Sequence, residues 1–430
     1  MHIIVIGSGL AGLTAAISLA KSGHRVQVLE SAPKITYIGA GIQVSPNSSR
    51  ILRHLGVDKF IEQYCTEPVD HRMLRWQDGK MLVQCPLKEP ARKEYGSPYW
   101  HIHRADLHRG LLECAESLGV ESFFDCRVVD ADPALPSVTT KDGKQWTADL
   151  IIASDGLHST CRHIVLGRSS PPIPTGQMAY RVTLPASRLK GIEGLNDLIT
   201  IPGNVHWIGP KGTILSYLLE GINDTLVNLV FTCDVELGTM EDGVNQKNGT
   251  PDEVLKAFQG WDPRIGTIVQ HVDSVLEWRL YIHDSVDHWA HPSGRFCLIG
   301  DSAHAMTPYL AQGAAMGIED AAILGGLLEA FPDAKDLEES LAVYEKLRVG
   351  RTSMVAAASI DSRWFTQMED GPEQERRDEY LLSHPGIWPN HINIRSRKEF
   401  LDELFGYDAY AALEDELKAT GLNDRARKRM

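Results

Sequence analysis

The chain has 430 residues, of which 43% are hydrophobic and 23% are charged, and its formal net charge is -14 at pH 7. Length and composition are those of an ordered globular protein with roughly two or three domains. The net negative charge repels polyanions, so we do not expect a nucleic-acid partner.

The cysteines and the N-terminal residues indicate where the protein works. Cys is present seven times, an odd number with no Cys-x-x-Cys pair, which favours a reducing compartment over a disulfide framework. A predicted strand begins at His2, which leaves no room for a targeting peptide. No stretch reaches the roughly 18 uncharged apolar residues of a membrane span. We therefore expect a cytoplasmic protein without an integral membrane segment, either a monomer or a homodimer.

The first 30 residues predict a strand, a turn, a helix and a second strand. Residues 2–6 are an apolar run, GSGLAG follows, and Leu13, Ile17 and Ala20 then recur at helical spacing before the strand VQVLE. This order is a βαβ unit, in which the two strands are parallel. The same reasoning predicts a helix that starts at the Pro-Asn-Ser cluster of SPNSS, a second helix in HRADLHRGLLECAESLG, and buried strands at 150–154 and in FCLIG.

The remaining segments differ in character. Residues 73–99 contain three prolines and predict irregular strands, whereas residues 172–285 alternate like an antiparallel sheet. Within the latter, TILSYLLEGINDTLVNLVF predicts a hairpin with its turn at 221–224. From residue 346 the chain is mostly helical, with breaks at Pro372, Pro385 and Pro389.

A glycine motif lies in the first predicted turn. Gly7, Gly9 and Gly12, with Leu10 and Ala11 between them, form GxGxxG between a strand and a helix. Such a turn lets the backbone approach a pyrophosphate at the helix N-terminus. Glu30 ends the next strand, 18 residues after Gly12, where its carboxylate can accept hydrogen bonds from ribose hydroxyls. The pattern predicts a bound dinucleotide without deciding between NAD and FAD.

Two later turns also follow buried strands. One is DGLHSTCR, with Asp155, Gly156, Ser159 and Arg162, and the other is GDSAHAMTPYLAQGAAMGIEDA at residues 300–321. In this order, the three motifs resemble those of the class A flavoprotein monooxygenases, the FAD-dependent aromatic hydroxylases, and most closely their salicylate hydroxylase-like branch. The resemblance covers roughly residues 1–345, and three ordered motifs are more specific than any single one.

The resemblance implies an α/β fold with three parts. The first is a Rossmann-like FAD-binding domain and the second is an inserted substrate domain built on an antiparallel sheet. A helical C-terminal region completes the chain. The expected boundaries are 1–72, 100–171 and 286–345 for the FAD-binding domain, 73–99 and 172–285 for the substrate domain, and 346–430 for the helical region.

The resemblance also implies tightly bound FAD and a transient NAD(P)H, since the chain has no second GxGxxG motif. Asp301 is expected to form a hydrogen bond with the ribityl chain of FAD, and Arg104 is expected to reach its phosphate or ribose side. Ala311 and Ala315 replace a Gly and an Asn that are common in the family, so a side-chain contact with the flavin is not expected at Ala315. Asp155 and Arg162 are expected to support the pyrophosphate and to help the transient nicotinamide cofactor. The other expected contacts are Ala40 and Gly41 along the flavin, and Gly313 and Ala314 at its pyrimidine edge.

For the substrate, the resemblance implies catalytic roles for Arg181, Tyr217 and Pro308. An arginine fork and a tyrosine hydroxyl can hold a carboxylate or phenolate, and Pro308 is expected beside the flavin ring. Strand alternation places Leu215, Tyr217 and Leu219 on one face as an apolar wall. His304 is expected to be structural. His101 and His103 share a predicted strand, but no further ligand pattern accompanies them, so we predict no metal.

The implied function is that of a hydroxylase. With NAD(P)H and O2, it would act on a phenolic or aryl-carboxylate molecule through a flavin C4a-hydroperoxide, with or without decarboxylation or dearomatisation, in aromatic or secondary metabolism. One alternative is the same flavin chemistry on a non-aromatic alkene or ketone, giving epoxidation or ring expansion. A second is a flavin-binding interaction protein without turnover.

Overall fold

The structure is a computed structural model that describes residues 1–34, 40–221, 224–235, 246–385 and 397–422. A five-stranded parallel sheet forms its first layer, in the order β18-β11-β1-β2-β7. The predicted βαβ unit is confirmed, because β1 and β2 pair in parallel and α1 connects them. The predicted buried strands are confirmed as β11 and β18. The layer consists of β1 (His2–Ile6), α1 (Leu10–Lys21), β2 (Arg25–Leu29), β7 (Glu121–Phe123), β11 (Leu150–Ala153) and β18 (Phe296–Leu298).

Helices surround this sheet and share its apolar core. The helix α1 packs against both α5 and α11, and the small sheet β10-β9-β8 adds Val128, Val138 and Trp146 to the same core. The helix predicted at the Pro-Asn-Ser cluster of SPNSS is α2, with Ser45 at its N-cap and Pro46 at its first position. These elements are β3 (Gly41–Val44), α2 (Pro46–His54), α3 (Asp58–Ile61), η1 (Glu62–Tyr64), β6 (Trp100–His103), α5 (Arg104–Ser117), β8 (Val128–Asp132), β9 (Ser137–Thr140), β10 (Gln145–Thr147), α6 (Thr160–Leu166), α10 (Asp301–His304), η3 (Pro308–Leu310) and α11 (Gly313–Ala330).

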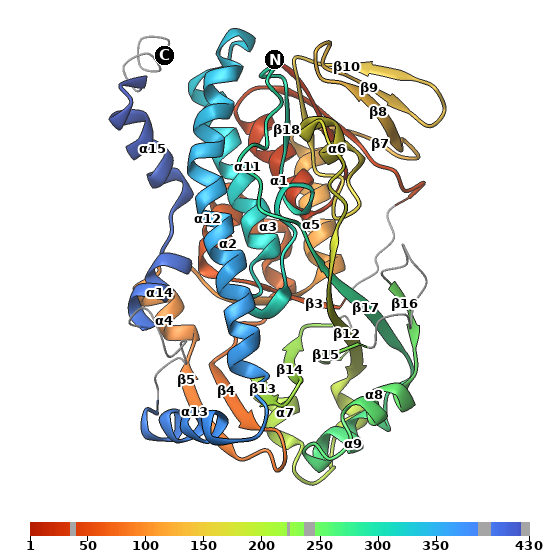
Figure 1. The fold of residues 1–430 in the computed structure, drawn as a ribbon, viewed down its shortest axis with the longest axis vertical. Coiled ribbons are helices and arrows are strands. Elements are labelled where there is room, and N and C mark those ends of the chain that lie inside the picture. The colour runs from red at the N-terminus through yellow and green to blue at the C-terminus, as the bar shows by residue number, and fades with distance from the viewer. Residues whose placement is uncertain (35–39, 222–223, 236–245, 386–396, 423–430) are drawn as a thin grey trace.

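An eight-stranded sheet forms the other half of the molecule, in the order β16-β17-β12-β15-β14-β13-β4-β5 (Figure 1). Its pairs are antiparallel except for β13 and β4, which are parallel. The predicted hairpin is confirmed as β14 and β15, although Ile222 and Asn223 of its turn lie outside the described residues. The strands are β4 (Asp70–Arg75), β5 (Met81–Pro86), β12 (Ile173–Pro185), β13 (Gly203–Gly209), β14 (Gly212–Leu219), β15 (Leu226–Asp234), β16 (Gln246–Gly249) and β17 (Val275–Ile282).

Residues 73–99 are more regular than their prolines suggested. They contain the second half of β4, all of β5 and the helix α4 (Lys88–Glu94), which was not predicted. Pro90 is the third residue of α4, within the first turn, where a proline costs no helical hydrogen bond. A second core lies between the eight-stranded sheet and the short helices η2 (Ala186–Leu189), α7 (Asn196–Thr200), α8 (Pro251–Ala257) and α9 (Pro263–Val269).

The C-terminal part is mostly helical over its described residues, as predicted. Its first helix, α12, runs along the length of the molecule beside both halves (Figure 1). Pro372 begins α13, which ends before Pro385, whereas Pro389 lies outside the described residues. No helix in the described part of the chain has the length and apolar character to cross a bilayer. The elements are η4 (Ala334–Asp336), α12 (Leu337–Thr366), α13 (Pro372–Ser383), α14 (Arg397–Leu404) and α15 (Ala409–Ala419).

Two of the expected domain boundaries fall inside these elements. Residue 73 lies within β4, and the division between 345 and 346 lies within α12. The second boundary was expected where the resemblance to the family ends, but a continuous helix gives no signal of its own at a domain junction. The division into domains stays a prediction.

Candidate active site

A cavity of about 450 Å³ lies where the two large sheets meet. The carboxyl ends of parallel strands are the usual ligand edge of such a sheet, and here β1, β11 and β18 all end at the cavity. The eight-stranded sheet supplies the opposite wall through β12, β13, β14, β15 and β17. Of the expected site residues, those in the lining are Gly9, Leu10, Ala11, Gly41, Arg104, Arg181, Tyr217, Asp301, Pro308, Gly313 and Ala314.

The three glycines of the first motif have different physical roles. Gly7 has a φ of +94°, and a Cβ there would lie 2.5 Å from the carbonyl oxygen of Ser154. At Gly12 a Cβ would lie 2.1 Å from the carbonyl oxygen of Gly7, so both positions require glycine for the turn itself. Gly9 has a φ of -67°, and a Cβ there would meet nothing within 4 Å. The space beside Gly9 is therefore left open.

That open space adjoins the N-terminus of α1, which is suited to an anion. No side chain caps this helix, and its first turn contains no acidic residue. The first N–H groups of a helix lack partners within the helix and carry the positive end of its dipole. The turn thus fits the pyrophosphate of a dinucleotide.

Glu30 lies at the end of β2, beside this turn. One carboxylate oxygen accepts from the backbone N–H of Ser8 at 2.8 Å and from its hydroxyl at 2.7 Å, and the other accepts from Ala32 N–H at 2.7 Å. Burial alone raises a carboxyl pKa, but these hydrogen bonds together hold the pKa of Glu30 below its ordinary value. Glu30 lies outside the cavity lining, and its predicted contact with ribose stays a prediction.

In the DGLHSTCR turn, Arg162 and Asp155 both make hydrogen bonds within the protein. Arg162 is 0% exposed, and its guanidinium donates to the carbonyl oxygens of Ser302, Ala303 and Asp284. These donors hold the backbone around α10, and the predicted support of the pyrophosphate by Arg162 stays a prediction. Asp155 likewise accepts from Ser159 Oγ and from the N–H of Cys161 at the start of α6.

Asp301 begins α10 and presents its carboxylate to the cavity. The side chain is open to the cavity but surrounded by protein, which raises the pKa of Asp301, while His304 and Arg104 lower it in part. Among the described residues, this carboxylate has no hydrogen-bond donor, and the Arg104 guanidinium has no carboxylate within 4 Å. A chain of hydroxyls such as ribityl, next to a phosphate, would satisfy both side chains.

The first turn of α11 also faces the cavity, through Gly313 and Ala314. Its N-cap residue Gln312 does not cap it, since that side chain donates to Ser45 Oγ at 3.0 Å and accepts from Asn47 at 3.1 Å. Ala315 is buried outside the lining, among Tyr99 and Phe405. The free N–H groups and the helix dipole favour negative charge at this place, as on the pyrimidine edge of a reduced flavin.

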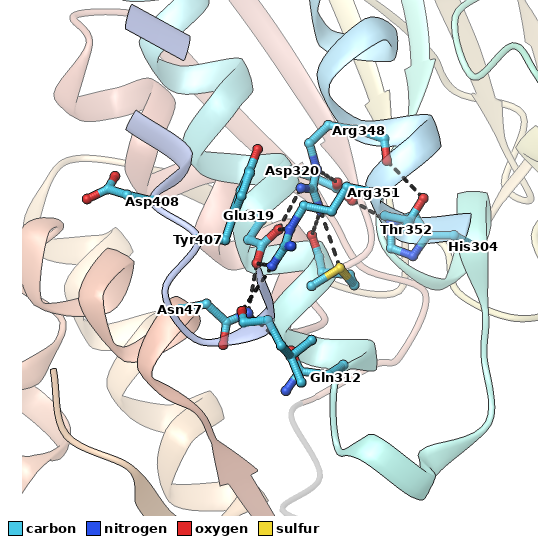
Figure 2. Close-up of polar contacts among 12 residues, drawn as sticks. Asn47, His304, Gln312, Glu319, Asp320, Arg348, Arg351, Thr352, Tyr407 and Asp408 are labelled. Carbon is cyan, nitrogen blue, oxygen red and sulfur yellow. Dashed lines mark hydrogen bonds and ion pairs between the residues drawn. The ribbon is translucent and has the colours of Figure 1, made fainter. Parts of the chain in front are cut away.

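A buried network of charges holds the turn at Gly300 and the start of α11 at Gln312 (Figure 2). Asp320 accepts from the Gly300 N–H at 2.9 Å, from His304 at 2.7 Å and from Arg348 at 2.8 Å. Glu319 accepts from Arg348, from Arg351 and from Asn47, which also holds Gln312. His304 therefore has the structural position that was expected for it, and the network joins α11 and α12 to the turn that carries Asp301.

Arg181 and Tyr217 lie on the opposite wall, and Pro308 lines the cavity from η3, which precedes α11. The Arg181 guanidinium carbon is 4.6 Å from the centre of the Trp278 ring, and its buried Nε has no hydrogen-bond partner. Among the described residues, no carboxylate lies within 4 Å of this cation. Burial lowers the pKa of Arg181, yet a guanidinium remains charged at neutral pH. The Arg181 guanidinium is therefore a positive charge in the cavity that can pair with a bound anion.

Tyr217 is positioned by close contacts. Its ring centre is 4.5 Å from that of His101, and a Cβ at Gly41 would lie 2.5 Å from its ring. Leu215 joins Tyr217 in the lining, whereas Leu219 is fully buried elsewhere. Ala40 lies just outside, where its carbonyl accepts from the Arg104 N–H at 3.1 Å. The lining also includes residues that sequence reasoning missed, among them Gln43, His206, Thr213, Trp278, Met306 and Tyr309.

Replacing Ala311 by Gly is expected to raise the free energy of unfolding by about 0.5–1 kcal/mol. Ala311 has a φ of 53°, a conformation that costs an L-residue roughly 1–2 kcal/mol, and the added freedom of the unfolded chain offsets part of the gain. The same change at the exposed Ala357 in α12 is expected to cost about 1 kcal/mol. Urea unfolding measures the change in the free energy of unfolding for both variants. If the two changes have the same sign, the backbone at Ala311 is not strained.

Comparison with known proteins identifies the family. The family model described as "FAD binding domain" matches residues 1–173 and 263–359. The chain is 34% identical over 426 residues to the FAD-dependent monooxygenase OpS4 of Beauveria bassiana, which covers 98% of both chains. It is 35% identical to the 3-amino-4-hydroxybenzoate 2-monooxygenase PtmB3 of Streptomyces platensis, over 88% of this chain and 91% of that one. The fold matches a salicylate hydroxylase substrate complex with a TM-score of 0.79 and 24% identity, over 96% and 97% of the two chains.

The matches to OpS4 and to the salicylate hydroxylase structure extend over nearly the whole chain, and the family model covers more than half of it. All agree with the glycine turn, the free helix N-termini and the unpaired groups around the cavity. The chain belongs to the FAD-dependent class A flavoprotein monooxygenases, enzymes that use NAD(P)H as reductant.

Proposed function

We propose that this monooxygenase hydroxylates a small aromatic substrate that carries a hydroxyl and an acidic group, such as a hydroxybenzoate. The observation that carries the proposal is Arg181, a cation without a carboxylate partner among the described residues, set in a wall that includes Leu215, Val230 and Trp278. An aromatic acid fits this arrangement, because its ring packs on the apolar wall while its anion pairs with the guanidinium. One relative, PtmB3, is named for a substrate of this class.

The residues of the chain would divide the work as follows. FAD, when bound and reduced by NAD(P)H, supplies the oxygen-activating chemistry. Arg181 and the Tyr217 hydroxyl hold the substrate anion, which orients the ring and keeps it electron-rich. Pro308, Met306 and Leu215 keep water away from the reacting positions, since they present no hydrogen-bonding side chain to the cavity.

The test is to purify the protein, record its flavin absorbance, and follow NAD(P)H oxidation with hydroxybenzoates, salicylate and simple alkenes under labelled oxygen. We expect one labelled oxygen atom in the aromatic product. Label in an alkene or ketone product instead would favour epoxidation or ring expansion, and oxidation that no aromatic acid stimulates would overturn the proposal.

We further propose that the enzyme binds FAD tightly and works in the cytoplasm as a monomer or a homodimer. All seven cysteines are free, which agrees with a reducing compartment. Sedimentation of the holoenzyme would distinguish the two oligomeric states, and fractionation of the source cells would test the location.

Gly9→Ala is expected to weaken FAD binding at least tenfold, about 1.4 kcal/mol, without changing the thermal stability of the protein freed of flavin. A Cβ at this position enters only open space in the protein itself, but that space adjoins the helix N-terminus offered to the pyrophosphate. Gly12→Ala is the matched control, since it should destabilise the flavin-free protein as well. Unchanged FAD affinity in the Gly9→Ala variant would contradict the placement of the pyrophosphate.

A further inference from the structure

A second, smaller cavity of about 100 Å³ adjoins the first. The two share six lining residues, namely Gln43, His206, Leu215, Pro308, Tyr309 and Ala311. The remaining walls of the second cavity include Phe365 of α12 and Phe400 of α14. His206 therefore stands at the junction of the two cavities.

His206 lies on β13 and contacts Thr213, which lies across the sheet on β14. The Nε2 atom of His206 and the hydroxyl of Thr213 form a hydrogen bond. The same hydroxyl lies 3.0 Å from the carbonyl oxygen of Trp207. The Thr213 hydroxyl therefore holds the imidazole ring at Nε2, and the backbone at Trp207 holds that hydroxyl in place.

The hydroxyl of Thr213 has a single proton, and this decides which nitrogen of His206 carries a hydrogen. A carbonyl oxygen can only accept, so both contacts are hydrogen bonds only when the hydroxyl proton goes to Trp207. The hydroxyl oxygen must then accept from Nε2–H of His206. A neutral ring protonated at Nε2 leaves Nδ1 as a bare acceptor.

Two further observations favour this state. Burial lowers the pKa of His206 to about 4, so the ring is neutral at physiological pH. Within the described residues, Nδ1 of His206 has no hydrogen-bond partner, although the ring lines both cavities. The cavity therefore offers an unpaired anion-binding group in Arg181 and an unpaired acceptor in His206.

We propose that Nδ1 of His206, kept free of a proton by Thr213, accepts a hydrogen bond from the hydroxyl group of the substrate. His206 would then make the enzyme select hydroxy-aromatic acids over their O-methylated counterparts, while Arg181 binds the acid group. This inference rests on the proposed function, because it concerns the substrate of the same cavity. Thr213 acts through His206 and is a positioning residue.

The tautomer can be tested without knowing the substrate. Long-range ¹H–¹⁵N spectra of the holoenzyme labelled with [¹⁵N]histidine distinguish a protonated ring nitrogen from a bare one, and His206→Leu identifies the signals of this residue. We expect a neutral ring with its proton on Nε2, and in Thr213→Val we expect that preference to be lost. A proton on Nδ1 in the unaltered protein would overturn the proposal.

The selectivity is tested by titrating the holoenzyme with hydroxybenzoates and hydroxynicotinates, each paired with its methoxy counterpart, while recording the flavin absorbance. We expect the hydroxy member of at least one pair to bind roughly 10- to 100-fold more tightly, since the methoxy group leaves the buried acceptor unpaired. In His206→Leu this ratio should fall to within about threefold, and Thr213→Val should lower it in part.

Thr232→Val is the matched control. Thr232 lies opposite Thr213 in the sheet register and also lines the cavity. Its hydroxyl donates to the carbonyl oxygen of Thr213, and among the described residues it makes no hydrogen bond with His206. The ratio of hydroxy to methoxy affinity in this variant should equal that of the unaltered enzyme, because the substitution removes a hydroxyl but leaves Nδ1 of His206 unchanged.

If no pair of compounds shows a preference, or if His206→Leu weakens the binding of both members equally, the inference is wrong. If hydroxylated product forms but the hydroxy and methoxy compounds bind equally, the inference about His206 is refuted and the proposed function is not. If no compound gives a hydroxylated product, the proposed function itself is refuted.

Discussion

Arg181→Ala is expected to lower kcat/KM for the aromatic substrate by about 10²- to 10³-fold, roughly 3–4 kcal/mol of transition-state stabilisation, while FAD remains bound. The guanidinium is the cation on the substrate wall, and it has no carboxylate partner of its own among the described residues. Without it, the substrate anion enters an apolar cavity unpaired and the ring is poorly oriented.

The measurement is steady-state oxidation of NAD(P)H at several substrate concentrations, combined with the flavin absorbance of the purified variant. Arg188→Ala is the control, since Arg188 lies on the surface in an ion pair of 2.6 Å with the exposed Asp273. Its kinetics should equal those of the unaltered enzyme. If Arg181→Ala turns over normally, the substrate anion binds elsewhere and the proposed substrate site is wrong.

Arg348→Met is expected to lower the free energy of unfolding by about 3–5 kcal/mol. Arg348, Glu319 and Asp320 are all 0% exposed, and Arg348 donates to Glu319 at 2.6 Å and to Asp320 at 2.8 Å (Figure 2). Methionine fills a similar volume but leaves the Asp320 carboxylate with two donors among the described residues, His304 and the Gly300 N–H. The large cost arises from buried charge left without its partner, not from lost packing.

Urea unfolding measures this loss, and Arg363→Met on the same helix is the control. Arg363 makes a partly exposed ion pair of 3.0 Å with Asp234, and its replacement should cost no more than about 1 kcal/mol. Equal losses in the two variants would show that the buried network contributes no more than a surface pair. A second readout is FAD binding, which should weaken because Asp320 holds the turn that carries Asp301.

The same network predicts a loss of stability in acid. Burial alone raises a carboxyl pKa, but Arg351 and Arg348 hold the pKa of Glu319 below its ordinary value, and His304 and Arg348 do so for Asp320. Carboxyls with a lowered pKa in the folded state stabilise it above their unfolded pKa of about 4, and this contribution is lost as the pH falls below that value. Arg348→Met should flatten this acid limb of the stability curve. An unchanged acid limb would contradict the pairing.

Much of this protein could be predicted from local sequence. The apolar run at 2–6, the glycines of the first turn and the helical spacing that follows predicted a βαβ unit, because each pattern depends only on neighbouring residues. The three turn motifs predicted the family and the cofactor for the same reason. The hairpin of β14 and β15 was predicted from alternation on either side of one turn.

The tertiary structure alone decided which side chains face the cavity. Arg162 belongs to a turn motif of the family, yet its donors are directed to carbonyl groups of a segment 122 to 141 residues further along the chain. His206 and Thr213 carry no motif, and only strand pairing brings them together at the junction of the two cavities. Local patterns determine backbone conformation and the apolar face of each element. The partner of a polar side chain is set by which distant elements pack beside it, and a single sequence does not contain that information in any one stretch.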